Sequence, residues 1–242
     1  MTVIKGTLAL LLVDEFDFSG DTAGFGVAVN MTEEECTTLG SEGAEYEPIL
    51  PSMAIDHNGY VSGVSDAGEF EAELYSRLGV AGSFVAALLG TDVAACPAYV
   101  QNTFGANMQM QAPAKSLMTL NGAWGKGRGG SRGIRVFSGS ISGTGNATSV
   151  DLGSAGSDGG KAYLFVQSIT GSASNASFKV QSATTEGGSY SDEGTFTVSA
   201  VGGYEVDLSG TVNRWVRLNT ASMGGATGFV AVLVVCVNGV TQ

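Results

Sequence analysis

His57 is the single histidine of this 242-residue chain, so any site that needs a base near neutral pH would have to use it. It stands in Asp56-His57-Asn58-Gly59, a run of turn-forming residues, and we therefore expect it in a turn. Neither Asp158-Gly159-Gly160 nor Asp192-Glu193-Gly194 has the alternating oxygen ligands of a calcium loop, and no Cys and His cluster has zinc spacing. We expect no catalytic residue, no cofactor and no metal.

A glycine-rich basic segment, residues 125–135, carries four of the chain's eleven basic residues: Lys126, Arg128, Arg132 and Arg135. A Walker loop would need Ser or Thr directly after its Gly-Lys pair, and Gly127 stands there instead, although weaker phosphate binding stays open. The segment is otherwise a solvated loop, or a hairpin that carries its arginines to an acidic neighbour such as another copy of the chain. The last interpretation makes the four basic residues a candidate inter-subunit contact.

The charge balance of the chain is strongly acidic, with 23 acidic residues, 11 basic residues and a formal net charge of −12. This sign argues against a protein that grips phosphate backbones or anionic membranes. An acidic surface could, however, line a passage through which DNA slides without sticking. The apolar run from Leu8 to Val13 is too short to span a bilayer, so we expect a strand or a packing arm there.

The composition indicates many short strands. Glycine accounts for 37 residues and proline for only 4, in a chain that is 43% hydrophobic. Glycines scattered between β-branched runs supply turns and bulges. The three cysteines, Cys36, Cys96 and Cys236, are widely and irregularly spaced, so we expect them to be reduced and buried.

One helix stands out against this background. Asp66 and Glu69 have capping-box spacing, Phe70, Leu74 and Leu78 recur at every fourth position, and Gly79 would end the helix. We therefore expect a helix near residues 66–78, with one apolar stripe against a sheet. Residues 83–89 suit a short helix or a buried strand equally well, and the acidic stretch from Glu33 to Pro51 is typical of a polar loop.

The second half of the chain has regularly spaced strand signals separated by turns rich in Gly, Ser, Asp and Asn. The expected strands are 149–152, 162–169, 177–181, 195–199, 204–208, 214–218 and 229–237. A Gly/Ser/Thr-rich stretch at 138–147 suggests a join. We expect an all-β protein with one flanking helix, divided into a β-sandwich at 1–140 and a C-terminal β-sandwich or jelly roll at 141–242 that folds as its own unit.

Several segments are similar to the major tail tube proteins of long-tailed phages, especially phages of actinobacteria. In the first half these are Phe18-Ser-Gly, Thr37-Thr-Leu-Gly-Ser and Asn58-Gly-Tyr-Val-Ser-Gly before the helix. In the second half they include Ser149-Val-Asp-Leu-Gly, Lys161-Ala-Tyr-Leu-Phe-Val, Gly194-Thr-Phe-Thr and Arg214-Trp-Val-Arg-Leu. The resemblance lies in the types of residues in these segments and in the order of the segments, over most of the chain. It includes no catalytic motif.

The resemblance implies a virion protein, made in the host cytoplasm, that forms stacked six-membered rings around a channel for DNA. It also implies contacts with a tape measure protein and with tail terminator and tail tip proteins, and no role for a membrane. The alternatives are a capsid decoration protein and a carbohydrate-binding β-sandwich module. The second would need an aromatic platform, and of the two tryptophans, Trp124 and Trp215, we expect Trp215 to point inward because it alternates with Arg214 and Arg217.

Overall fold

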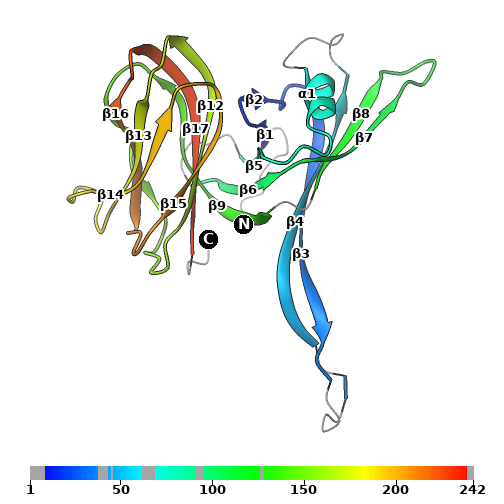
Figure 1. Cartoon of the computed structure of the whole chain (residues 1–242), viewed down its shortest axis with the longest axis horizontal. Coiled ribbons are helices and arrows are strands. Elements are labelled where there is room, and N and C mark those ends of the chain that lie inside the picture. Colours follow the sequence, from blue (N-terminus) through cyan, green and yellow to red (C-terminus); the bar gives the residue numbers. More distant parts are fainter. Residues whose placement is uncertain are drawn as a thin grey trace. The chain divides into compact units, whose positions relative to one another are not determined.

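The computed structural model describes residues 9–37, 43–44, 46–61, 69–90, 95–125 and 128–238. Apart from one short helix, its regular elements are strands, which confirms the expected all-β class (Figure 1). In chain order the elements are β1 Ala9–Val13, β2 Phe16–Asp17, β3 Thr22–Glu35, β4 Tyr46–Tyr60, α1 Phe70–Ser76, β5 Ser83–Leu89, β6 Pro97–Thr103, β7 Gly105–Gln111, β8 Thr119–Trp124, β9 Arg128–Ile141, β10 Gly145–Asn146, β11 Val150–Asp151, β12 Gly160–Gly171, β13 Ala176–Ala183, β14 Ser191–Val198, β15 Gly202–Leu208, β16 Trp215–Ser222 and β17 Ala226–Val237.

The chain divides into two compact units. The first comprises Met1–Gly20, Phe84–Val100 and Ser131–Gln242, and the second comprises Asp21–Ser83 and Gln101–Gly130. Each of the seven strands expected beyond residue 148 is present in the first unit. The expected boundary at 140/141 falls at the end of β9, a strand that pairs with β17. Independent folding of residues 141–242 stays a prediction.

The first unit contains a β-sandwich. Its larger sheet has the order β15-β12-β17-β9-β6-β5-β1-β2, and its smaller sheet has the order β10-β16-β13-β14 with β11 beside β16. Inward side chains of both sheets form one core, in which the rings of Phe178 and Phe229 meet edge to face at 5.0 Å. Alternate residues of β13 and β16 face this core, which is the pattern of a strand covered on one side.

Strands β12 and β17 are buried on both faces. Leu164 and Leu233 face the sandwich core, whereas Tyr163 and Val232 belong to a second cluster shared with β1, β5 and β6. A strand covered on both sides needs apolar residues without alternation, and the run 229–237 has them. The sequence of residues 83–89 suited a helix or a strand equally well; in the structure this segment is strand β5, and it packs in this second cluster.

The second unit is a four-stranded antiparallel sheet, β3-β4-β8-β7, with helix α1 (Figure 1). The expected helix is present but shorter than 66–78: it spans Phe70–Ser76, and Gly79 follows it with a φ of +71°. Its N-cap is Glu69 and not Asp66, which lies outside the described residues, and Leu78 lies beyond its C-terminal end. Phe70 and Leu74 are buried, as the apolar stripe predicted.

The acidic stretch at 33–51 is not a loop throughout, contrary to expectation. Glu33 to Glu35 end β3, and residues 46–51 begin β4, so the two strands form a long hairpin. The acidic side chains misled the prediction because this hairpin is exposed, and an exposed strand needs no apolar residues at these positions.

Two further expectations about burial are wrong. Cys36 is exposed, whereas Cys236 is buried and Cys96 is partly exposed; none of the three forms a disulfide. Trp215 shares its face of β16 with Arg217, two residues away, while Val216 and Leu218 point into the core. Trp215 is therefore on the outer face of the smaller sheet. No helix among the described residues is long and apolar enough to cross a membrane.

Candidate functional site

Helix α1 covers one face of the four-stranded sheet, and Gly122 of β8 makes this close contact possible. A Cβ at Gly122 would lie 2.5 Å from Leu74 Cδ2 and 3.2 Å from Phe70 Cζ. The ring of Phe70 also lies 3.9 Å from the ring of His57 on β4, measured between centroids. The helix is therefore held by apolar and aromatic packing onto β4 and β8.

His57 is not in a turn, contrary to expectation: it occupies the interior of β4 and is 2% exposed. Its Nε2 atom lies 2.7 Å from Thr22 Oγ1 on β3. Burial lowers the pKa of His57 from 6.5 to about 4, so the ring is neutral at pH 7. Enclosed beneath the helix, His57 is placed for packing rather than for proton exchange with a substrate.

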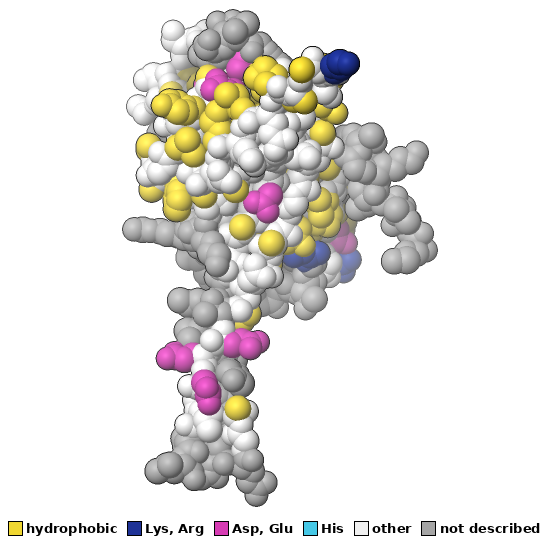
Figure 2. Space-filling model, turned by 90° about the vertical axis from the view of Figure 1, so that its right-hand side faces the viewer, with side chains coloured by type: hydrophobic (Ala, Val, Ile, Leu, Met, Phe, Trp, Pro, Cys, Tyr) yellow, Lys and Arg dark blue, Asp and Glu magenta, His cyan; other side chains and the backbone are white. Residues whose placement is uncertain are grey.

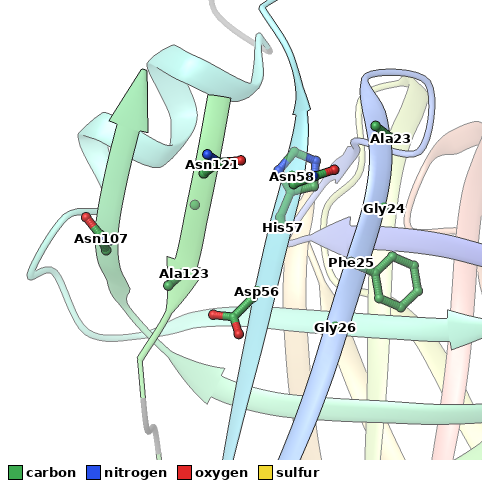
Figure 3. Close-up of a pocket in the computed structure, with 11 residues that line it drawn as sticks. Ala23, Gly24, Phe25, Gly26, Asp56, His57, Asn58, Asn107, Asn121 and Ala123 are labelled. Carbon is green, nitrogen blue, oxygen red and sulfur yellow. The ribbon is translucent and has the colours of Figure 1, made fainter. Parts of the chain in front are cut away.

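The opposite face of the sheet is an open hollow of about 620 Å³ (Figure 3). The register brings together small residues and amides across β3, β4 and β8, because Gly24, Asn58 and Asn121 occupy one row and Gly26, Asp56 and Ala123 the next. Figure 3 shows Asp56 on β4 and Asn107 on β7 on either side of β8. A floor of small and amide side chains gives a smooth, weakly charged surface.

This hollow lacks the groups of a hydrolytic or metal centre. Asp56 is the single carboxylate in its lining, and the one imidazole there belongs to the buried His57. Across the described ranges, no three His, Cys, Asp or Glu side chains are gathered to hold a metal ion. The pentapeptide Gly129 to Gly133 has the Gly-x-Ser-x-Gly spacing of a nucleophile turn, but it lies inside strand β9, without the required turn into a helix.

The hairpin of β3 and β4 extends beyond the rest of its sheet (Figure 1). Strand β8 pairs with β4 from Ile55 to Tyr60, and in the described part of the chain the earlier residues of β4 pair only with β3. We call this two-stranded part, residues 28–35 and 46–54, the arm. Figure 2 shows acidic side chains on the arm, and Glu33, Glu34 and Glu35 are exposed there.

One face of the arm continues the apolar face of the sheet. Val27, Val29 and Met31 follow one another at alternate positions of β3, opposite Ile55, Met53 and Pro51 of β4. Ile55 and Met53 are buried, but Val29 is 57% exposed and Met31 is 54% exposed. Two-stranded ribbons are at best marginally stable alone in water. The arm therefore presents an apolar surface that a neighbouring molecule could cover.

The four basic residues singled out in the sequence do not form one exposed cluster, because one of them is buried. Arg132 is exposed on β9, whereas Arg135 is 1% exposed, with Nη2 3.8 Å from Cys96 Sγ. Arg128 begins β9, and its side chain is not described; Lys126 lies outside the described residues. From Arg128 onward the segment is strand and not loop, and Arg132 is the exposed one of its two described arginine side chains.

Sequence reasoning missed the arm and the outer face of the smaller sheet. The alternation of Phe25, Val27, Val29 and Met31 with small residues was visible in the sequence and signals a strand with one apolar face. Nothing in the sequence showed that this apolar face would extend beyond the part of the sheet that is packed against other elements, because that depends on where β8 stops pairing with β4.

No protein-family model matches the sequence, and no curated protein matches it. Solved structures show that the chain is similar to tail and baseplate proteins. A chain of the virion of a native gene transfer agent particle is 11% identical, with a TM-score of 0.38 over 50% of this chain and 94% of that one. A chain of the tail of an empty gene transfer agent particle, refined with C6 symmetry, is 12% identical, with a TM-score of 0.39 over 54% and 98%. The SPP1 Dit protein, described as a paradigm of hub adsorption apparatus in phages infecting Gram-positive bacteria, is 9% identical, with a TM-score of 0.32 over 93% and 98%.

Proposed function

We propose that this chain is a structural, non-enzymatic protein of a phage tail, and that its copies assemble into stacked hexameric rings to form the hollow tail tube. The single observation that carries the proposal is the arm, whose apolar face is uncovered at Val29 and Met31. A second copy of the chain is the occupant that the sequence resemblance favours. The assembly would belong to the virion, built from protein made in the host cytoplasm.

Burial of the arm supplies a driving force for assembly. Fully burying a Val or Met side chain stabilises by about 1.5–3 kcal/mol, so covering the exposed half of each contributes about 1 kcal/mol. This small term is repeated at every subunit of a ring and between rings, and such repetition makes assembly strongly concentration-dependent.

The edges of the four-stranded sheet offer a second contact. By the described pairings, β3 and β7 each have one neighbour in this sheet. Strand edges of this kind can pair with an edge of another copy. On β7 this pairing would lie beyond Gly105, because the backbone of Gly105 is already bonded to Arg77 and Gly79. In a ring, repeated edge pairing would join the helix-free faces into one continuous wall.

We further propose that this wall lines the channel. Its hollow holds glycines, amides and the carboxylate of Asp56, with no Lys or Arg in the lining. DNA phosphates find no cation to hold them there, and the net charge of −12 repels them. DNA would therefore be a passenger, while the tape measure, tail terminator and tail tip proteins would be the structural partners.

The test is a pair of variants on the same strand. Val29→Ser combined with Met31→Ser removes the exposed apolar surface, and Asn30→Ala changes the opposite face of the arm as a matched control. We expect the double variant to stay folded by circular dichroism but to need at least about tenfold more protein to assemble in sedimentation experiments, with Asn30→Ala behaving as wild type. Unchanged assembly by the double variant would overturn the proposal that the arm carries the contact.

A further inference from the structure

The outer face of the smaller sheet in the first unit carries an ordered polar and aromatic surface. Strand register places Gln181 between Arg217 of β16 and Asp192 of β14, and Lys179 beside Asn219 in the next row. Trp215 occupies the same face, opposite Ala183. Ala183 is 1% exposed although alternation directs it outward, as expected for a small residue covered by larger neighbours.

These side chains form a connected hydrogen-bond network. Arg217 Nε donates to Gln181 Oε1 at 3.0 Å, and Gln181 Nε2 donates to Asp192 Oδ1 at 2.7 Å. Lys179 Nζ donates to Asp192 Oδ2 at 2.5 Å. The network fixes the positions of alternating donors and acceptors across three neighbouring strands.

Aromatic rings flank this network. The Arg217 guanidinium lies 3.7 Å from the ring centroid of Tyr190, and the Arg214 guanidinium lies 6.0 Å from that of Trp215. The hydroxyl of Tyr190 donates to the carbonyl of Glu186 at 2.9 Å, which holds the ring in place. Trp215 and Tyr190 together thus provide aromatic rings beside this network. The sequence had offered only Trp124 and Trp215 for the aromatic platform of a sugar-binding protein.

Fold stability gives little reason for this surface. The Lys179 and Asp192 side chains are 31% and 43% exposed, and exposed ion pairs contribute only about 0–1 kcal/mol. Holding long polar side chains in one arrangement costs side-chain entropy. A fixed polar array is instead useful to a ligand, because the binding partner then loses less to reorganisation.

We propose that this face is a carbohydrate-binding surface for a neutral polysaccharide. Sugar hydroxyls both donate and accept, so they suit an array in which Gln181, Asp192 and Lys179 offer both functions. The C–H faces of a sugar ring can stack on Trp215 beside Arg217. The basic side chains Lys179 and Arg214 are each paired with a carboxylate, Asp192 and Asp151, so the charges on this face are largely balanced and offer little to the phosphates of a nucleic acid.

The experiment measures retardation of the full-length protein in native gels that contain one polysaccharide each: mannan, arabinogalactan, amylose, or the anionic polymer alginate. We expect at least one neutral polysaccharide to slow the wild type. Trp215→Ala and Gln181→Ala should each weaken that binding by at least about tenfold. Lys161→Ala is the matched control. Lys161 lies on β12, away from the proposed surface, and its Nζ lies 2.5 Å from Glu205 Oε1, so the variant also removes an ion pair.

Circular dichroism and thermal unfolding of each variant separate lost binding from lost folding, and Gln181→Ala keeps the test informative if Trp215→Ala fails to fold. Binding by the wild type and the Lys161→Ala variant, together with weaker binding by a folded surface variant, would support the proposal. No retardation in any neutral polysaccharide would overturn it. Retardation in alginate alone, or retardation unchanged in Gln181→Ala, would overturn it as well.

Discussion

The ring centroids of His57 and Phe70 lie 3.9 Å apart, so the chain's only imidazole is part of the surface on which helix α1 packs. A charged imidazolium in this place would lose its hydration without gaining a carboxylate, since burial is the cause of the lowered pKa. The fold therefore favours the neutral ring over the charged one.

We predict that His57 makes folding stability depend on pH. Its pKa is about 4 in the folded chain and 6.5 in the unfolded chain, so the unfolded chain binds more protons between these values. Stability is therefore fully present above about pH 6.5 and falls by about 3 kcal/mol as the pH decreases to 4. Denaturant unfolding at several pH values should show this loss.

The control for this prediction is His57→Gln, which keeps a polar side chain but does not titrate. The variant should be less stable at pH 7 yet lose about 3 kcal/mol less than the wild type between pH 6.5 and pH 4, while both retain the same carboxylates. Parallel pH profiles for the two proteins would show that His57 is not the source.

We predict that Gly122→Ala destabilises the second unit by about 1–3 kcal/mol, because the added methyl group would overlap Leu74 and crowd Phe70. Gly26→Ala is the matched control: Gly26 lies on β3 of the same sheet, and its Cβ would meet nothing within 4 Å. Urea unfolding monitored by circular dichroism compares the two. Equal stability would mean that α1 does not pack as tightly on β8 as described.

The exposed arginine of β9 gives a prediction about assembly. Arg132→Glu should slow tube formation, because it replaces a cation able to meet acids such as Glu33 to Glu35 of another copy. Lys115→Glu makes the same charge change at another exposed site. Light scattering at low and high salt should show a larger defect for Arg132→Glu, and a defect that shrinks with screening. Equal defects would indicate a general effect of net charge.

Much of the fold was predictable from local patterns. The seven strands of the second half, the stripe of Phe70 and Leu74, and the continuous apolar run of β17 all carry signals set by side-chain period and burial. The errors on His57 and Trp215 share one physical cause. The settings of His57 and Trp215 depend on which strands and helices cover a given face, and this information lies in segments distant in sequence.

The surfaces were harder to predict than the elements. Arg132 and Arg135 are three residues apart in one basic segment, yet one is exposed and the other is buried. The composition of the segment shows only that both residues are basic and not which of them is buried. In the same way Tyr190 reaches Arg217 only because β13 and β14 bring a turn alongside β16.

The central claim, self-assembly into a hollow tube, is tested most directly by negative-stain electron microscopy of the concentrated wild-type protein. We predict tubes built of stacked rings, with end-on views that show six subunits around an open channel. Particles of monomer size at every concentration, or filaments without a channel, would contradict it.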